Sequence, residues 1–93
     1  MIHCGDTYAK DAKVRMAHPL LVDDVAVDYP DVKFVICHLG NPWFQDTAEV
    51  LYKNDNVYAD ISGLTLGDFT YEFERYMVKR VKEMIMYMGD PGK

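Results

Sequence analysis

Residues 32–43 read Val-Lys-Phe-Val-Ile-Cys-His-Leu-Gly-Asn-Pro-Trp, and the rest of the chain can be understood from this stretch. Its first six residues are almost all apolar, which is typical of a parallel strand that is covered on both faces. His38 follows this run, and a glycine turn and a helix over residues 41–53 come next. In α/β folds, functional side chains gather where parallel strands end. His38 is therefore the first candidate for a functional residue.

The composition indicates a folded domain and excludes several classes of partner. The chain has 93 residues, of which 49% are hydrophobic and 13% aromatic, so we expect one globular domain over residues 1–93. A net charge of −5 argues against nucleic acid or an anionic membrane as the main partner. The apolar runs are shorter than the ~20 residues that span a bilayer. Two cysteines without a paired motif, and no signal-peptide pattern, favour a cytoplasmic location.

Strand and helix patterns alternate along the whole chain. The expected strands end near residues 3, 38 and 62, and the expected helices cover residues 18–30, 41–53 and 70–88. Pro30 and Gly89 supply helix stop signals, while residues 6–15 and 64–68 read as loops. The third strand is expected to cover residues 57–63. Such alternation predicts a parallel sheet with right-handed crossovers.

The apolar spacing also predicts which side of each helix faces the sheet. The predicted inward positions are Leu21, Val22, Val25 and Tyr29 in the first helix, Ala48, Leu51 and Tyr52 in the second, and Phe73, Met77, Val81, Met84, Ile85 and Met88 in the third. The methionines of the last helix, Met86 included, are expected to fill the core. Strand ends that lie 35 and 24 residues apart bracket the roughly 30-residue unit of a ~250-residue (β/α)8 barrel. The chain then holds about three such units, an α/β fold that forms part of a barrel.

Five short stretches, taken in order, carry a family resemblance. They are Ile2-His3-Cys4-Gly5, His18-Pro19-Leu20, the run from Tyr29 to Lys33, the run from His38 to Trp43, and the run from Asn56 to Gly63. In order and spacing they resemble the amidohydrolase-related family of metal-dependent hydrolases and decarboxylases. The resemblance implies a (β/α)8 TIM barrel, of which this chain is similar to the region of strands five to seven.

The resemblance also implies roles for single residues. His3 resembles a strand-five metal ligand, and His38 resembles a strand-six histidine that acts as acid or base. The implied cofactor is a divalent metal, with Zn²⁺ as the first choice. The family's first-strand His-x-His pair is absent from the sequence. Asp90 either replaces the aspartate of the strand-eight motif or lies in a turn after the last helix, and helical spacing up to Met88 favours the turn.

Other residues allow both a functional and a structural interpretation. Trp43 is a candidate for substrate binding, but it can equally pack the helix start onto the sheet. Asp60 can face the barrel mouth and bind substrate, or it can cap a loop. His18 precedes Pro19 at a helix start, which favours a structural or capping role. Cys4 and Cys37 each adjoin a histidine, yet adjacent strand residues point to opposite faces, which argues against a Cys2His2 zinc site.

Three functions are consistent with the sequence. The first is a fragment of a metal-dependent hydrolase that acts on C–N, C–O or C–C bonds of a small molecule, with a non-oxidative decarboxylase of the same family as its close variant. The second is a catalytically silent barrel fragment that self-associates through open sheet edges and uncovered apolar faces. The third is a freestanding α/β binding module, but the sequence lacks a phosphate-binding loop with its lysine.

Overall fold

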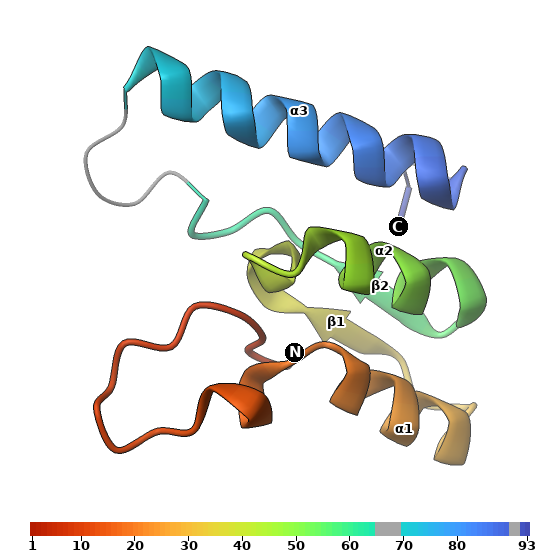
Figure 1. Ribbon diagram of the computed structural model, residues 1–93. Coiled ribbons are helices and arrows are strands. Elements are labelled where there is room, and N and C mark those ends of the chain that lie inside the picture. The colour runs from red at the N-terminus through yellow and green to blue at the C-terminus, as the bar shows by residue number, and fades with distance from the viewer. Residues whose placement is uncertain (65–69, 90–91) are drawn as a thin grey trace.

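The sheet at the centre of the molecule is parallel and short. The computed structural model describes residues 1–64, 70–89 and 92–93. Their elements are a 3₁₀ helix Val14–Ala17, α1 Leu20–Asp28, β1 Phe34–Ile36, a tight turn Cys37–Gly40, α2 Phe44–Lys53, β2 Val57–Ala59 and α3 Tyr71–Met88 (Figure 1). This order confirms the predicted alternation, and a parallel pair of strands with helical connections is the architecture of part of a TIM barrel.

Backbone hydrogen bonds define the order of segments across the sheet. In the register of β1 and β2, Phe34 lies beside Val57 and Ile36 beside Ala59. The expected N-terminal strand is present as a single parallel bridge, in which the Ile2 amide donates to the Val35 carbonyl at 2.7 Å. At the opposite edge, the Ala59 amide donates to the Lys93 carbonyl at 2.9 Å. The segments therefore lie across the sheet in chain order: the N-terminal segment at Ile2, then β1, then β2, then Lys93.

The core lies between the sheet and the helices. Ile36 and Val57 are fully buried, and they pack with Leu51 of α2 and with Met77 and Met84 of α3. Val35 and Tyr58, which are paired across the two strands, do not belong to this core cluster. Because successive strand residues point to opposite faces, these two side chains lie on the face away from the helices.

Several predicted inward positions are wrong. The buried residues of α1 are Val22 and Ala26, whereas Leu21 is 40% and Tyr29 is 60% exposed. The first helix is short, and its contact with the sheet is a narrow i, i+4 stripe instead of the wide face that the pattern suggested.

Some predicted inward positions of α2 and α3 are also wrong. Tyr52 is 61% exposed at the edge of α2, where its ring meets the ring of Tyr87. Met86 is 82% exposed, because it lies two residues from Met84 and Met88 and thus about 200° around the helix from each. Ile85 is also exposed, at the border of the stripe that Met77, Val81 and Met84 form.

The ends of the elements follow local chemistry. The α3 helix begins where Thr70 Oγ1 accepts a hydrogen bond from the Phe73 amide, and it ends at Gly89 in the left-handed region, as predicted. Both strands are shorter than expected, because the chain turns at Cys37 and again at Asp60. Residues 65–68 of the predicted loop lie outside the described residues, as does Asp90, whose placement is therefore untested.

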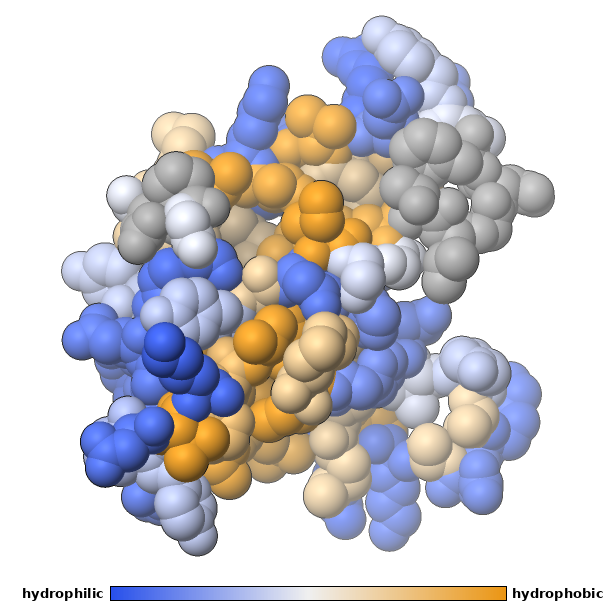
Figure 2. Space-filling view, turned by 180° about the vertical axis from the view of Figure 1, so that it is seen from behind, coloured by the Kyte–Doolittle hydropathy of each residue, from blue (hydrophilic) through white to orange (hydrophobic). Residues whose placement is uncertain are grey.

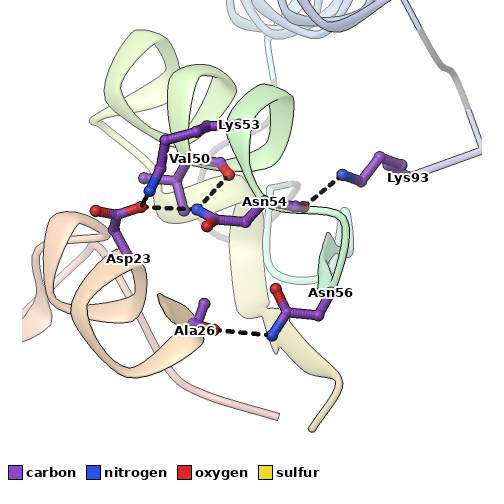
Figure 3. A network of polar contacts seen from close by, with 7 residues as sticks. All are labelled: Asp23, Ala26, Val50, Lys53, Asn54, Asn56 and Lys93. Atoms are coloured by element: carbon purple, nitrogen blue, oxygen red, sulfur yellow. Dashed lines mark hydrogen bonds and ion pairs between the residues drawn. The ribbon is translucent and has the colours of Figure 1, made fainter. Parts of the chain in front are cut away.

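A polar network ties α1, α2 and the start of β2 together at the end of the sheet where the strands begin (Figure 3). Asp23 receives hydrogen bonds or ion-pair contacts from Lys53 Nζ and Asn54 Nδ2, both at 2.7 Å. Asn56 Nδ2 contacts the carbonyls of Ala26, Tyr29 and Val32, which close the end of α1. This network stabilises the end of the sheet where the strands begin. His38 lies at the opposite end, after β1.

Candidate active site

His3 and His38 meet at the carboxyl ends of neighbouring segments of the sheet. Their ring centroids lie 5.1 Å apart, and the rings are inclined at 66°. Ile2 and Cys4 pack into the core, so His3 between them points to the opposite face and is exposed. The structure therefore brings together the two histidines that the sequence analysis named as metal ligand and acid or base.

The hydrogen bond of His3 indicates which of its nitrogens is available. His3 Nε2 lies 3.1 Å from the carbonyl oxygen of Asp6. A carbonyl oxygen only accepts, so Nε2 carries the hydrogen and donates. In neutral His3 the lone pair then lies on Nδ1, and this nitrogen is the one that can bind a cation.

His38 is held in an unusual backbone conformation. His38 and Leu39 have φ values of 62° and 50°, in the left-handed region that residues other than glycine rarely adopt. Each such residue costs about 1–2 kcal/mol. Two hydrogen bonds to Asp60 support the turn, one from the His38 amide to Asp60 Oδ1 at 3.0 Å and one from the Leu39 amide to the Asp60 carbonyl at 2.9 Å. Strain of this kind is commonly stored at functional sites.

Asp60 caps the loop that follows β2, which is one of its two predicted roles. Its Oδ1 accepts hydrogen bonds from Ser62 Oγ at 2.6 Å and from the Ser62 amide at 3.1 Å. The hydroxyl of Ser62, followed by the amides of His38 and Ser62, holds the pKa of the Asp60 carboxyl below its usual value. The carboxylate is thus ionised and its Oδ1 is occupied by the loop, which favours a supporting role over contact with substrate.

Sequence reasoning missed Ser62 as a member of the site. Ser62 contacts His38 Nδ1 with both its carbonyl oxygen, at 2.8 Å, and its Oγ, at 3.0 Å. The signal was present in the sequence, because an aspartate followed two residues later by a serine and then a glycine is typical of an Asx turn. Only the pairing of β1 with β2 brings that turn to His38.

The two cysteines next to the histidines, Cys4 and Cys37, are not joined by a disulfide. Cys4 is 2% exposed, and burial raises its thiol pKa, with the nearby Cys37 as a further cause. Burial also raises the pKa of the Cys37 thiol, and the negative charge of Asp60 adds to this effect.

His18 and Trp43 form a second pair of rings in contact. The His18 ring contacts the Trp43 ring at a centroid distance of 4.7 Å, and His18 Nε2 lies 2.9 Å from Asp46 Oδ2. His18 Nδ1 accepts from the Leu20 amide at 3.2 Å, which confirms its predicted role at the start of α1. Trp43 also lines a cleft of about 760 Å³ between α2 and α3, and the lining, where it is described, includes neither His3 nor His38.

The described residues of one chain do not complete a catalytic metal site. Zinc in enzymes usually has three protein ligands and a water. Within residues 1–64, 70–89 and 92–93, no group of three or more histidine, cysteine, aspartate or glutamate side chains is placed to hold a metal ion. The imidazoles of His3 and His38 lie close together, and further metal ligands would have to come from other residues.

Comparison with known families gives a match that covers most of the chain. The family model described as amidohydrolase matches residues 1–86. The chain belongs to the amidohydrolase family. This is a family of generally metal-dependent hydrolases, and membership confirms both the resemblance and the partial barrel seen in the sequence. No curated protein and no solved structure gives a significant match. Among the described helices, none has both the length and the apolar character needed to cross a membrane.

Proposed function

We propose that this chain carries part of the active site of a metal-dependent hydrolase that cleaves a C–N, C–O or C–C bond of a small molecule. The observation that supports this is the pair of histidines from separate segments, with ring centroids 5.1 Å apart at the carboxyl end of a parallel sheet. Active sites of parallel α/β barrels lie at this end of the sheet. Membership of the amidohydrolase family supports the reaction class.

The two histidines take different roles in this proposal. His3 is a ligand of a divalent metal, with zinc as the first choice, because neutral imidazole binds zinc well. His38 acts as acid or base toward the substrate, a role for which imidazole is suited near neutral pH. The remaining metal ligands come from residues outside the described part of one chain. The proposal therefore includes no step that depends on the metal geometry.

The test is metal content per chain, measured by elemental mass spectrometry on the purified protein. The chain has three histidines, which allows a matched set of variants. His3→Ala and His38→Ala are expected to lower bound zinc or manganese by about tenfold or more, since ligands and their neighbours control affinity to this extent. His18→Ala is the control, because the His18 ring contacts Asp46 and Trp43. Metal content that is the same in all three variants would contradict the proposal.

Product analysis distinguishes hydrolysis from decarboxylation. A panel of amides and esters tests the hydrolase, and release of CO₂ from aromatic carboxylates tests the decarboxylase. For either activity, His38→Ala is expected to reduce kcat by about 10²–10⁴, the usual contribution of a general acid or base. His18→Ala should retain kcat, provided that both variants show the circular dichroism of the unmodified chain.

A second candidate is a catalytically silent fragment that self-associates. The observation in its favour is apolar surface: Figure 2 shows hydrophobic residues gathered across the middle of the face opposite to the one seen in Figure 1. Exposed apolar area on this scale promotes association. This candidate predicts an oligomer with little metal and no turnover, so the metal measurement separates it from the first.

A further inference from the structure

The loop after β2 surrounds one ring nitrogen of His38 with hydrogen-bond acceptors. His38 Nδ1 lies 2.8 Å from the Ser62 carbonyl oxygen, and a carbonyl oxygen cannot donate. Ser62 Oγ lies 3.0 Å from the same nitrogen. Its single hydrogen points to Asp60 Oδ1, 2.6 Å away, because an ionised carboxylate also only accepts. Oγ therefore offers His38 a lone pair, and Nδ1 must be the nitrogen that carries hydrogen.

Asp60 is the group that keeps this arrangement in place. One oxygen, Oδ1, accepts from the amides of His38 and Ser62 as well as from the Ser62 hydroxyl. The Asp60 amide donates to the Ile36 carbonyl at 2.9 Å, which anchors the loop to the end of β1. The same residue thus fixes the left-handed turn at His38, the loop at Ser62 and the direction of the Ser62 hydroxyl.

Gly63 allows the His38 ring to approach the loop this closely. It has a φ of +72°, and a Cβ at this position would lie 2.8 Å from His38 Nδ1. Any other residue would push the ring away from the Ser62 carbonyl. Ser62 therefore contacts Nδ1 of His38, Asp60 holds Ser62 in place, and Gly63 leaves room for the ring.

We propose that Asp60 and Ser62 are positioning residues that hold neutral His38 as its Nδ1–H tautomer, so that the lone pair lies on Nε2. A histidine whose second nitrogen is fixed by a carbonyl or carboxylate presents the first in a defined direction and charge state. The meaning of this for catalysis rests on the function proposed above: Nε2 would be the atom that takes or delivers the proton. The tautomer itself depends neither on turnover nor on bound metal.

The test is nitrogen NMR of the histidine side chains in ¹⁵N-labelled protein with a metal chelator present. The spectra are recorded at about pH 8.5, roughly two units above the ordinary histidine pKa, because the two neutral tautomers give distinct Nδ1 and Nε2 shifts. His3 and His18 provide internal references of the opposite kind. His3 Nε2 donates to the Asp6 carbonyl, and His18 Nδ1 accepts from the Leu20 amide, so both should be Nε2–H. His38 should stand apart as Nδ1–H. An Nε2–H signature or an averaged signature for His38 would overturn the proposal.

Variants then test whether Asp60 and the loop are the cause. Asp60→Ala frees the Ser62 hydroxyl to donate to Nδ1 and should move His38 toward the Nε2–H form. Asp55→Ala is the matched control, because Asp55 is an exposed aspartate in the preceding turn. Ser62→Thr keeps the hydroxyl and should keep the tautomer of the unmodified chain.

Gly63→Ala gives an independent variant that leaves every hydrogen-bonding side chain in place and displaces the ring instead. It should also shift His38 toward Nε2–H, and it serves as the decisive variant if circular dichroism shows that Asp60→Ala does not fold. An unchanged Nδ1–H signature in either folded variant would show that the loop does not set the tautomer. Loss of metal binding or activity with an intact tautomer would count against the proposed function and not against this inference.

Discussion

At the scale of single residues, Gly40 shows how closely the turn after His38 packs on α2. Gly40 has a φ of +68°, and a Cβ at this position would overlap the hydroxyl of Thr47. Thr47 is fully buried, so its side chain has no space into which it can retreat. The glycine is therefore required both for the backbone conformation and for the contact between the turn and the helix.

Gly40→Ala should accordingly destabilise the chain more than the same change at Gly89. Both glycines have positive φ, but a Cβ at Gly89 would meet nothing within 4 Å. Gly89→Ala should cost about 1 kcal/mol from backbone strain alone. Gly40→Ala adds about 1–3 kcal/mol of overpacking. Urea denaturation followed by circular dichroism measures both, and equal losses would show that the contact with Thr47 does not matter.

Asn56 is a second residue whose role depends on the tertiary fold. Its Nδ2 contacts three carbonyls at the end of α1, with distances from 2.9 to 3.2 Å (Figure 3 draws the contact to Ala26). Asn56→Ala should lower the free energy of unfolding by about 1–3 kcal/mol, because the Ala26 carbonyl loses its donor in a part-buried contact. Asp55→Ala, at the exposed neighbouring position, should stay within about 0.5 kcal/mol. Unfolding of the two variants at the same denaturant concentration would contradict this stabilising role of Asn56.

At the scale of elements, the contact between α1 and α2 combines apolar packing with one ionic group. Val22 and Ala26 bury the inner side of α1, and Asp23 on the next position reaches Lys53 and Asn54 at the end of α2. The hydrogen bonds from Lys53 and Asn54 hold the pKa of the Asp23 carboxyl below its ordinary value. Docking of the two helices should therefore depend on pH.

The sign of this dependence follows from the direction of the shift. Because the pKa of Asp23 is lower in the folded chain than in the unfolded chain, the unfolded chain binds more protons in acid. The contribution of Asp23 is complete above the unfolded value of about 3.9 and is lost as the pH falls through the folded value. Asp23→Asn should flatten the loss of stability below about pH 4, as measured by denaturation at a series of pH values. Asp24→Asn, at the exposed neighbour, should follow the unmodified chain, and parallel curves for all three proteins would contradict the assignment.

At the scale of the whole molecule, the described residues form a thin layer in which the helices lie on one face of the sheet. Its extents are 40 × 36 × 16 Å, and the helices cover one face of the sheet (Figure 1). Val35 and Tyr58 lie on the other face, outside the core cluster. In a complete (β/α)8 barrel this side of the sheet faces the packed barrel interior. We therefore expect the chain to self-associate through the face of the sheet that lies away from the helices.

Val35→Lys tests this expectation. A charge on this face of the sheet should shift the chain toward monomer in sedimentation velocity. Met86→Lys is the comparison, because Met86 is 82% exposed on the outer side of α3. If Met86→Lys reduced association and Val35→Lys did not, the chains would associate through the outer side of α3 and not through the face of the sheet that carries Val35.

The sequence alone determined the order of elements, the glycine stop of α3 and the place of His38 at a strand end. These features depend on local spacing and on residue types such as Gly89 and the apolar run before His38, so they can be read from neighbouring residues. Only the tertiary structure decided the true inner stripe of α1, the exposure of Tyr52, and the contact between Ser62 and His38. Those depend on how β1 and β2 pair and on how each helix rotates against the sheet, and contacts between residues more than twenty positions apart leave no local pattern.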